Sequence, residues 1–202
     1  ANASTAASVD LTSADHLSNA VDASLETTGH AAFTGDSIDL GNQAGDLMLW
    51  GTLSFNATGL VEISEDEATV LAESSTAGDL VLQSASSITN DPNASAVVTG
   101  NADFTALAIV LGNQAGDLFQ FGSLTFHSTG AVEIYEDDST LLSGASSAAT
   151  LILESTGAIA NDSTADLAVV GNGNFKGASN DLGGQAGDAM RFGSLTFHST
   201  GA

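Results

Sequence analysis

The chain has 202 residues and a formal net charge of −23, and Lys176 and Arg191 are its only basic side chains. A polyanion with two cations cannot neutralise phosphates, so this composition argues against nucleic-acid binding and against attraction to an anionic membrane surface. The absence of cysteine excludes disulfides and thiolate metal sites. No apolar run approaches the roughly 18 residues of a membrane-spanning helix, so we expect no membrane insertion.

The sequence repeats with a constant step of 71 residues. The segment LGNQAGDL that begins at Leu40 returns at Leu111, and it returns again as LGGQAGDA at Leu182. Fixed-period repetition is typical of solenoids and other repeat arrays. We therefore divide the chain into the end of a preceding repeat, two full repeats and an incomplete third, which together predict one continuous solenoid over 1–8, 9–79, 80–150 and 151–202.

Both ends of the chain fall inside this pattern, because residues 1–8 match 72–79 and Ala202 is the counterpart of Ala131. Repeat arrays normally end in atypical polar units that cover the core. The sequence therefore predicts a solenoid that is uncapped at both ends. It also predicts that the natural object continues, either within one chain or by head-to-tail docking of subunits.

Within each repeat the local pattern indicates strands. Apolar and polar residues alternate in LVLQS at Leu80, LTFHS at Leu124, VEIYE at Val132 and LILES at Leu151. Each of these segments would turn one face inward. Ser-Thr-Gly, Asn-Asp and Gly-Asn clusters between them are typical of turns. We expect almost no helix.

A weaker similarity inside the repeat predicts its coil structure. LTFHSTGAV at Leu124 resembles LILESTGAI at Leu151, which indicates coils of about 20 to 27 residues and about three coils per repeat. Short parallel strands stacked about 4.8 Å apart would then build an all-β, right-handed parallel β-helix, a β-solenoid of about eight or nine coils.

These segments also resemble a known family. The STGA turns, the alternating strands and the GNxxFTA and LGNQAGD segments are similar to the repeats of filamentous-haemagglutinin-like β-helices in very long secreted bacterial proteins. The resemblance covers the whole chain. It implies secretion and a role at the cell surface or in the matrix, and it brings no catalytic residues with it.

The glycine-rich segment is predicted to be a structural turn. A phosphate-binding loop would need a lysine and a following helix, and this segment has neither. Glycines at unusual dihedrals and a side-chain hydrogen bond from aspartate explain it better. The predicted turn residues are Gly41, Gly45, Asp46, Gly112, Gly116, Asp117, Gly183, Gly187 and Asp188.

A recurring acidic cluster is the one candidate metal site. Hard cations such as Ca²⁺ take several oxygen ligands from a short segment, although this spacing fits neither an EF-hand nor the calcium-binding nonapeptide. A solvated acidic edge explains the cluster equally well. Weak Ca²⁺ binding is therefore a hypothesis for Glu62, Glu65, Asp66, Glu67, Glu133, Glu136, Asp137 and Asp138, and no other cofactor is expected.

The histidines do not predict a metal centre. His127 and His198 lie one repeat apart, which three coils would separate by about 14 Å, too far to share one ion. His16 and His30 occur once each, and we expect all four to be exposed polar residues. The sequons at Asn2, Asn56, Asn93 and Asn161 are of the number that chance produces in a chain rich in Asn, Ser and Thr.

The sequence is compatible with three functions. The first is that of a structural segment of an extracellular or cell-surface fibre, which assembles end to end with itself. The second is the stalk of a secreted adhesin that binds cell-surface or matrix glycans through a head elsewhere. The third is a carbohydrate-active β-helix enzyme. An active site needs one constellation in one place, whereas this chain distributes similar residues over its copies, so we expect no enzyme.

Overall fold

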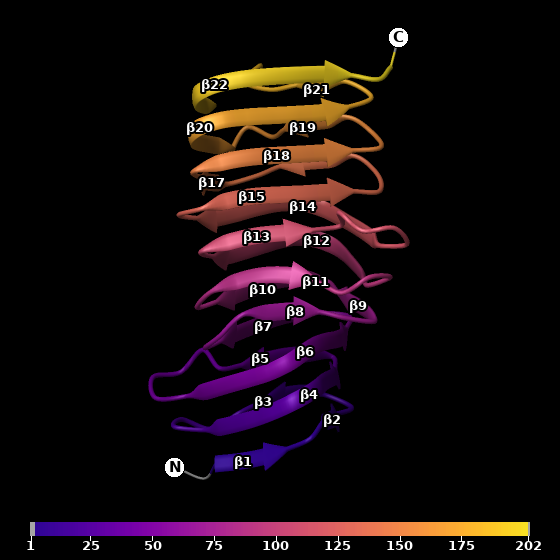
Figure 1. Ribbon diagram of the computed structural model, residues 1–202, viewed down its shortest axis with the longest axis vertical. Helices are drawn as coiled ribbons and strands as arrows, with labels where there is room; N and C mark the ends of the chain where they lie inside the picture. The colour runs from indigo at the N-terminus through magenta and orange to yellow at the C-terminus, as the bar shows by residue number, and fades with distance from the viewer. Residues whose placement is uncertain (1–2, 202) are drawn as a thin grey trace.

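The computed structural model describes residues 3–201, which form strands and turns. No helix occurs among them, and so none that is long and apolar enough to cross a membrane. The chain winds into a parallel β-solenoid of about 9 turns, with β1 at one end and β22 at the other (Figure 1). The predicted all-β solenoid is confirmed. Ala1, Asn2 with its sequon, and Ala202 lie outside the described residues.

Alternating side chains explain each strand. In β10 (Asp79–Ser84), Leu80 and Leu82 are fully buried while Val81 between them is partly exposed. Leu80 pairs with Val61 in the coil before it and with Ala102 in the coil after it, in parallel register. Stacked apolar side chains of this kind fill the interior along the whole rod, so the core is one continuous column.

The strands line three faces of the solenoid. Three pairs of long strands each bend around a corner and contribute one half to each of two faces: β4 (Ser24–Gly35) with β6 (Leu47–Ala57), β12 (Ser95–Ala106) with β14 (Leu118–Ser128), and β20 (Asp166–Gly177) with β22 (Ala189–Ser199).

The first face contains one half of β4, β6, β20 and β22 together with β1 (Ala3–Ala6), β8 (Thr69–Leu71), β11 (Ser87–Asn90), β13 (Ala108–Leu111), β15 (Ala131–Glu136) and β18 (Thr150–Ser155). The second contains halves of β4, β6, β12 and β14 with β2 (Val9–Thr12), β9 (Ser74–Ala77), β16 (Thr140–Leu142), β19 (Ile159–Asn161) and β21 (Asn180–Asp181). The third contains halves of β12, β14, β20 and β22 with β3 (His16–Ser18), β5 (Ser37–Leu40), β7 (Leu60–Glu65), β10 and β17 (Ala145–Ala148).

Successive repeats are rotated about the axis by one face. The strands of 9–79 run from β2 to β9, and since β4 and β6 each cover two faces they provide ten face segments, or three and a third turns. Phe33 therefore stacks on Phe55 on the second face, whereas its counterpart Phe104 stacks on Phe126 on the third. The prediction of about three coils per repeat is confirmed, and the strand pairing adds this rotation.

The corners explain a glycine that returns with every repeat. A Cβ on Gly51 would clash with the Thr28 carbonyl oxygen of the coil before it, and a Cβ on Gly122 would clash in the same way with that of Thr99. Consecutive coils approach so closely at this corner that only a residue without a side chain fits. Beside the corner an aromatic pair recurs inside the core, as in Phe33 with Trp50, whose ring centroids are 5.1 Å apart.

Candidate functional site

The glycine-rich turn is joined to the preceding coil by a set of hydrogen bonds that we call the amide staple, formed in the first repeat by Asn19, Gly41, Gln43 and Asp46. The Asn19 side chain accepts a hydrogen bond from the Gly41 amide at 2.8 Å and donates one to Asp46 Oδ2 at 2.8 Å. Gln43 donates its side-chain amide to the Asn19 carbonyl oxygen at 3.3 Å. Asp46 also accepts from the Gln43 amide within the turn at 3.1 Å.

The staple recurs in the second repeat, where Asn90 also donates to Asp117 Oδ2 at 2.8 Å, and it recurs without that Asn–Asp bond in the third. Gly112 donates to Asn90 Oδ1 at 2.9 Å, and Gly183 donates to Asn161 Oδ1 at 2.8 Å. The glycines of the turn adopt positive φ in every copy, from 72° to 107°, which side chains disfavour. Those glycines are Gly41, Gly45, Gly112, Gly116, Gly183 and Gly187. The segment that resembled a phosphate cradle thus uses its amides to hold one coil to the next.

Asn19, Asn90 and Asn161 are the functional residues that sequence reasoning left without a role. Their recurrence at the 71-residue step was visible, but no local motif joins them to a turn more than twenty residues later. Asn161 is also a sequon residue, yet it is buried and its side chain is already bonded, so a glycan there is incompatible with this fold. Asn56 and Asn93 are exposed.

The acidic cluster divides into buried and exposed carboxylates. Glu65 is 2% exposed; it accepts hydrogen bonds from the Trp50 amide at 3.0 Å and from the Thr69 hydroxyl at 2.7 Å. Its counterpart Glu136 is 3% exposed and accepts from Phe121 and Thr140 in the same way. The expectation of a solvated edge therefore does not describe these two glutamates, which end their strands pointing into the core.

Burial raises the pKa of both Glu65 and Glu136 to about 7. Desolvation is the largest cause, and it outweighs the hydrogen bonds from the threonine hydroxyl and the backbone amide, which favour the ionised form. Next to each, an aspartate accepts a further amide: Asp66 from Met48 at 2.7 Å and Asp137 from Phe119 at 2.8 Å. The carboxylates thus satisfy strand amides that have no neighbouring strand.

The remaining carboxylates of the acidic cluster do not accept hydrogen bonds from these strand amides. Glu62 and Glu133 are partly exposed in the middle of their strands, and Glu67 and Asp138 are exposed on the turn. Within residues 3–201, no three histidine, aspartate or glutamate side chains come together as a metal site would require. The structure therefore assembles no cation cage from the eight predicted carboxylates.

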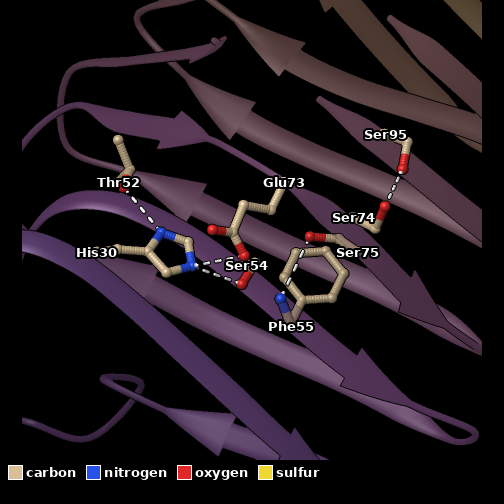
Figure 2. Close-up of polar contacts among 8 residues, drawn as sticks. All are labelled: His30, Thr52, Ser54, Phe55, Glu73, Ser74, Ser75 and Ser95. Atoms are coloured by element: carbon tan, nitrogen blue, oxygen red, sulfur yellow. Dashed lines mark hydrogen bonds and ion pairs between the residues drawn. The ribbon is translucent and has the colours of Figure 1, made fainter. Parts of the chain in front are cut away.

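His30 lies at the centre of the polar contacts in Figure 2. Its Nδ1 is 2.8 Å from the Thr52 hydroxyl and its Nε2 is 2.8 Å from the Ser54 hydroxyl, with Glu73 at 3.7 Å from the same Nε2. In a Ser-His-acid triad the acid binds Nδ1 while the serine binds Nε2. Here serine and acid approach one nitrogen, and Ser54 is buried. The arrangement is not that of a triad.

The other repeats explain the His30 contacts as structural. Asn101 stands in the place of His30 and accepts from Ser123 at 2.9 Å and from Thr125 at 3.3 Å. Asn172 contacts the corresponding hydroxyls of the third repeat. Beside His30 in Figure 2, the Ser75 hydroxyl accepts the Phe55 amide at 3.2 Å, where β6 changes partner from β8 to β9. Both features join neighbouring coils.

The histidines are distributed over the rod. His16 and His198 are exposed, whereas His30 and His127 are half-buried. His127 lies on β14, where it pairs with Thr105 on the third face, and His198 lies on β22 on the first face, paired with Lys176. The rotation of the repeats thus separates them by a face as well as by height, which the expected 14 Å along the axis did not include.

The chain was also compared with known proteins. It matches no family model, no curated protein and no solved structure. Its function is therefore inferred from the fold and from the contacts between its coils.

Proposed function

We propose that this chain is a structural segment of an extracellular protein fibre whose axis is the solenoid axis. The observation that carries the proposal is the amide staple, which joins coil to coil through equivalent residues in each of the three repeats. A residue set that holds the rod together at every repeat is what a load-carrying filament requires.

The surface charge and the packing between coils support the same proposal. A net charge of −23 keeps neighbouring rods apart and soluble. Within the rod Leu124 and Phe126 are fully buried between consecutive coils, and we propose that end-to-end stacking of rods extends the same packing.

A filamentous-haemagglutinin-like adhesin stalk is the second candidate. The similarity of the STGA turns and alternating strands to that family favours it, and the same rod would hold a binding head away from the cell. A stalk requires a non-repetitive domain joined to the array, whereas a fibre segment requires only more repeats. Surface labelling of intact cells with an antibody to the rod tests the extracellular location that both candidates share.

The test of the fibre is its length and its symmetry. Ten face segments per repeat predict a rise of about 16 Å for each 71 residues, compared with about 14 Å for three whole coils. Chains with three, six and nine repeats, imaged in negative stain, should form unbranched rods that lengthen by that amount. Fourier transforms of averaged long rods should show a layer line near 48 Å, the height of about ten coils, after which the same face returns. Compact particles at all repeat numbers would contradict the proposal.

A further inference from the structure

On the first face, three outward side chains form a column that differs from the equivalent column one repeat earlier. Tyr135 of β15 pairs with Glu154 of β18, and Glu154 pairs with Lys176 of β20, so the three side chains lie one above the other on consecutive coils. They border a surface cavity of about 350 Å³. Its other lining residues are Glu136, Asp137, Ser155, Thr156 and Thr200.

The preceding repeat contains an equivalent column with which this one can be compared. One repeat earlier, and therefore one face around the rod, the corresponding residues Ser64, Gln83 and Thr105 form the same column on the third face. All three are small or neutral there. In the column on the first face they are replaced by the only tyrosine of the chain, an acid and one of its two basic residues. Three changes that meet on adjacent coils in one cavity require a common explanation.

The contacts hold this column in place. The Tyr135 hydroxyl donates to Glu133 Oε1 on its own strand at 2.7 Å, which fixes the ring along the coil. That hydrogen bond raises the pKa of Tyr135 to about 12, so the hydroxyl is neutral at physiological pH. The Lys176 ammonium lies 2.6 Å from Glu154 Oε2. An aromatic ring beside a fixed pair of charged groups is therefore ordered before any ligand arrives.

The chemistry of the cavity selects among ligands. Lys176 is already paired with Glu154, and the rod is strongly negative, so an acidic ligand would find no free cation and would be repelled. Carboxylate, ammonium and hydroxyl groups next to one ring match a molecule that has many hydroxyl groups and one apolar face. About 350 Å³ lies at the small end of ligand sites, enough for one or two sugar rings.

We propose that the column of Tyr135, Glu154 and Lys176 is a binding site for a neutral oligosaccharide. The tyrosine ring would pack against the C–H face of one sugar, and the Glu154–Lys176 pair would accept and donate hydrogen bonds to its hydroxyls. The site goes beyond the fibre proposal, because it assigns a ligand to one stretch of the rod and requires no assembly. It would give a matrix filament a contact with surrounding polysaccharide.

Binding is tested by NMR titration of the chain with cellotetraose, mannotetraose and chitotetraose, each up to 5 mM. At least one of them should shift the ring signals of Tyr135, the single tyrosine, together with amides of β15 and β18. A hyaluronan tetrasaccharide, which is acidic, should bind at least tenfold more weakly. The proposal is wrong if no neutral probe binds or if the acidic probe binds equally well.

Two sets of variants localise the site. Y135S, E154Q and K176T install residues that the same positions already carry on the third face, so the fold is expected to tolerate them. Y135S should weaken binding at least tenfold, and an unchanged affinity would overturn the proposal. The reverse set S64Y/Q83E/T105K in the unaltered chain should create a second site and raise the stoichiometry from one to two. A stoichiometry that stays at one, in a chain whose strand signals are unchanged, would also contradict it.

Discussion

Asp46 in the amide staple and Glu65 in the acidic cluster perform the same task in different surroundings. Each carboxylate accepts a backbone amide for which no strand is available, Asp46 from Ala23 at 3.0 Å and Glu65 from Trp50 at 3.0 Å. Yet their pKa values move in opposite directions. Burial works to raise the pKa of Asp46, but hydrogen bonds led by that of Asn19 together lower it, whereas burial raises the pKa of Glu65 to about 7.

The difference shows that the degree of burial determines whether the charged or the neutral form of these carboxyl groups is favoured. A partly exposed aspartate keeps water at its free edge and is stabilised as an anion by every donor. A glutamate enclosed in the core has the same donors but loses its hydration, so the neutral acid is favoured. The solenoid therefore contains two classes of carboxylate whose contributions to stability respond to pH with opposite sign.

Removal of the buried carboxyl should have the largest effect. Glu136→Ala leaves the Phe121 amide and the Thr140 hydroxyl without partners and opens a cavity, which should cost about 3 to 4 kcal/mol of unfolding free energy. Glu136→Gln retains an oxygen for the amide and should cost about 1 kcal/mol. Urea unfolding at pH 5 measures both. Equal losses for the two variants would show that the hydrogen bonds of Glu136 do not matter.

The pH dependence of stability should have the next largest effect per residue. Glu65 and Glu136 have folded pKa values of about 7, above the usual value of 4.5, so the folded state binds protons that the unfolded state has released. Their contribution is complete below about pH 4.5 and declines as the pH rises through 7. The loss approaches about 3 kcal/mol per residue by pH 8.

The matched control for this effect is E65Q/E136Q, which cannot titrate at these two positions. The difference in unfolding free energy between the unaltered chain and this variant should fall from pH 5 to about pH 7, pass through zero and level off by pH 8. Other groups titrate equally in both chains and cancel. A difference that does not change with pH would mean that the two glutamates are ionised throughout this range.

The inward orientation of the buried glutamates could have been predicted from the sequence. The alternation in VEIYE places Val132 and Ile134 inward and therefore Glu136 inward as well, which is where the structure has it. The acidic neighbours concealed this, because a run of carboxylates suggests a solvated edge. In contrast, no sequence pattern shows that Asn90 reaches Asp117 across a coil, or that long strands such as β12 bend around a corner and rotate the next repeat by one face.

Replacement of glycines at positive φ by alanine tests how closely the coils approach each other. Gly112 and Gly144 both have positive φ, 75° and 62°, so replacement by alanine costs each about 1 kcal/mol for the left-handed backbone. A Cβ on Gly112 would also clash with the Tyr135 carbonyl oxygen, whereas on Gly144 its nearest neighbour is Thr125 Oγ1 at 3.6 Å. We expect Gly112→Ala to destabilise the chain by about 2 kcal/mol more than Gly144→Ala in thermal unfolding. Equal effects would mean that the coils separate easily at Gly112.

Asp46→Asn should have the smallest effect. It is also the most direct test of the difference between Asp46 and Glu65. An amide in this place offers a donor where the Gln43 amide needs an acceptor, so we expect a loss of about 1 kcal/mol at pH 7. The lowered pKa of Asp46 means that its contribution is present above the usual aspartate range and is lost as the pH falls below it. The advantage of the unaltered chain over D46N should therefore decrease toward acid, while its advantage over E65Q/E136Q should decrease toward base and reverse. Two curves that changed in the same direction would show that exposure does not separate these carboxylates.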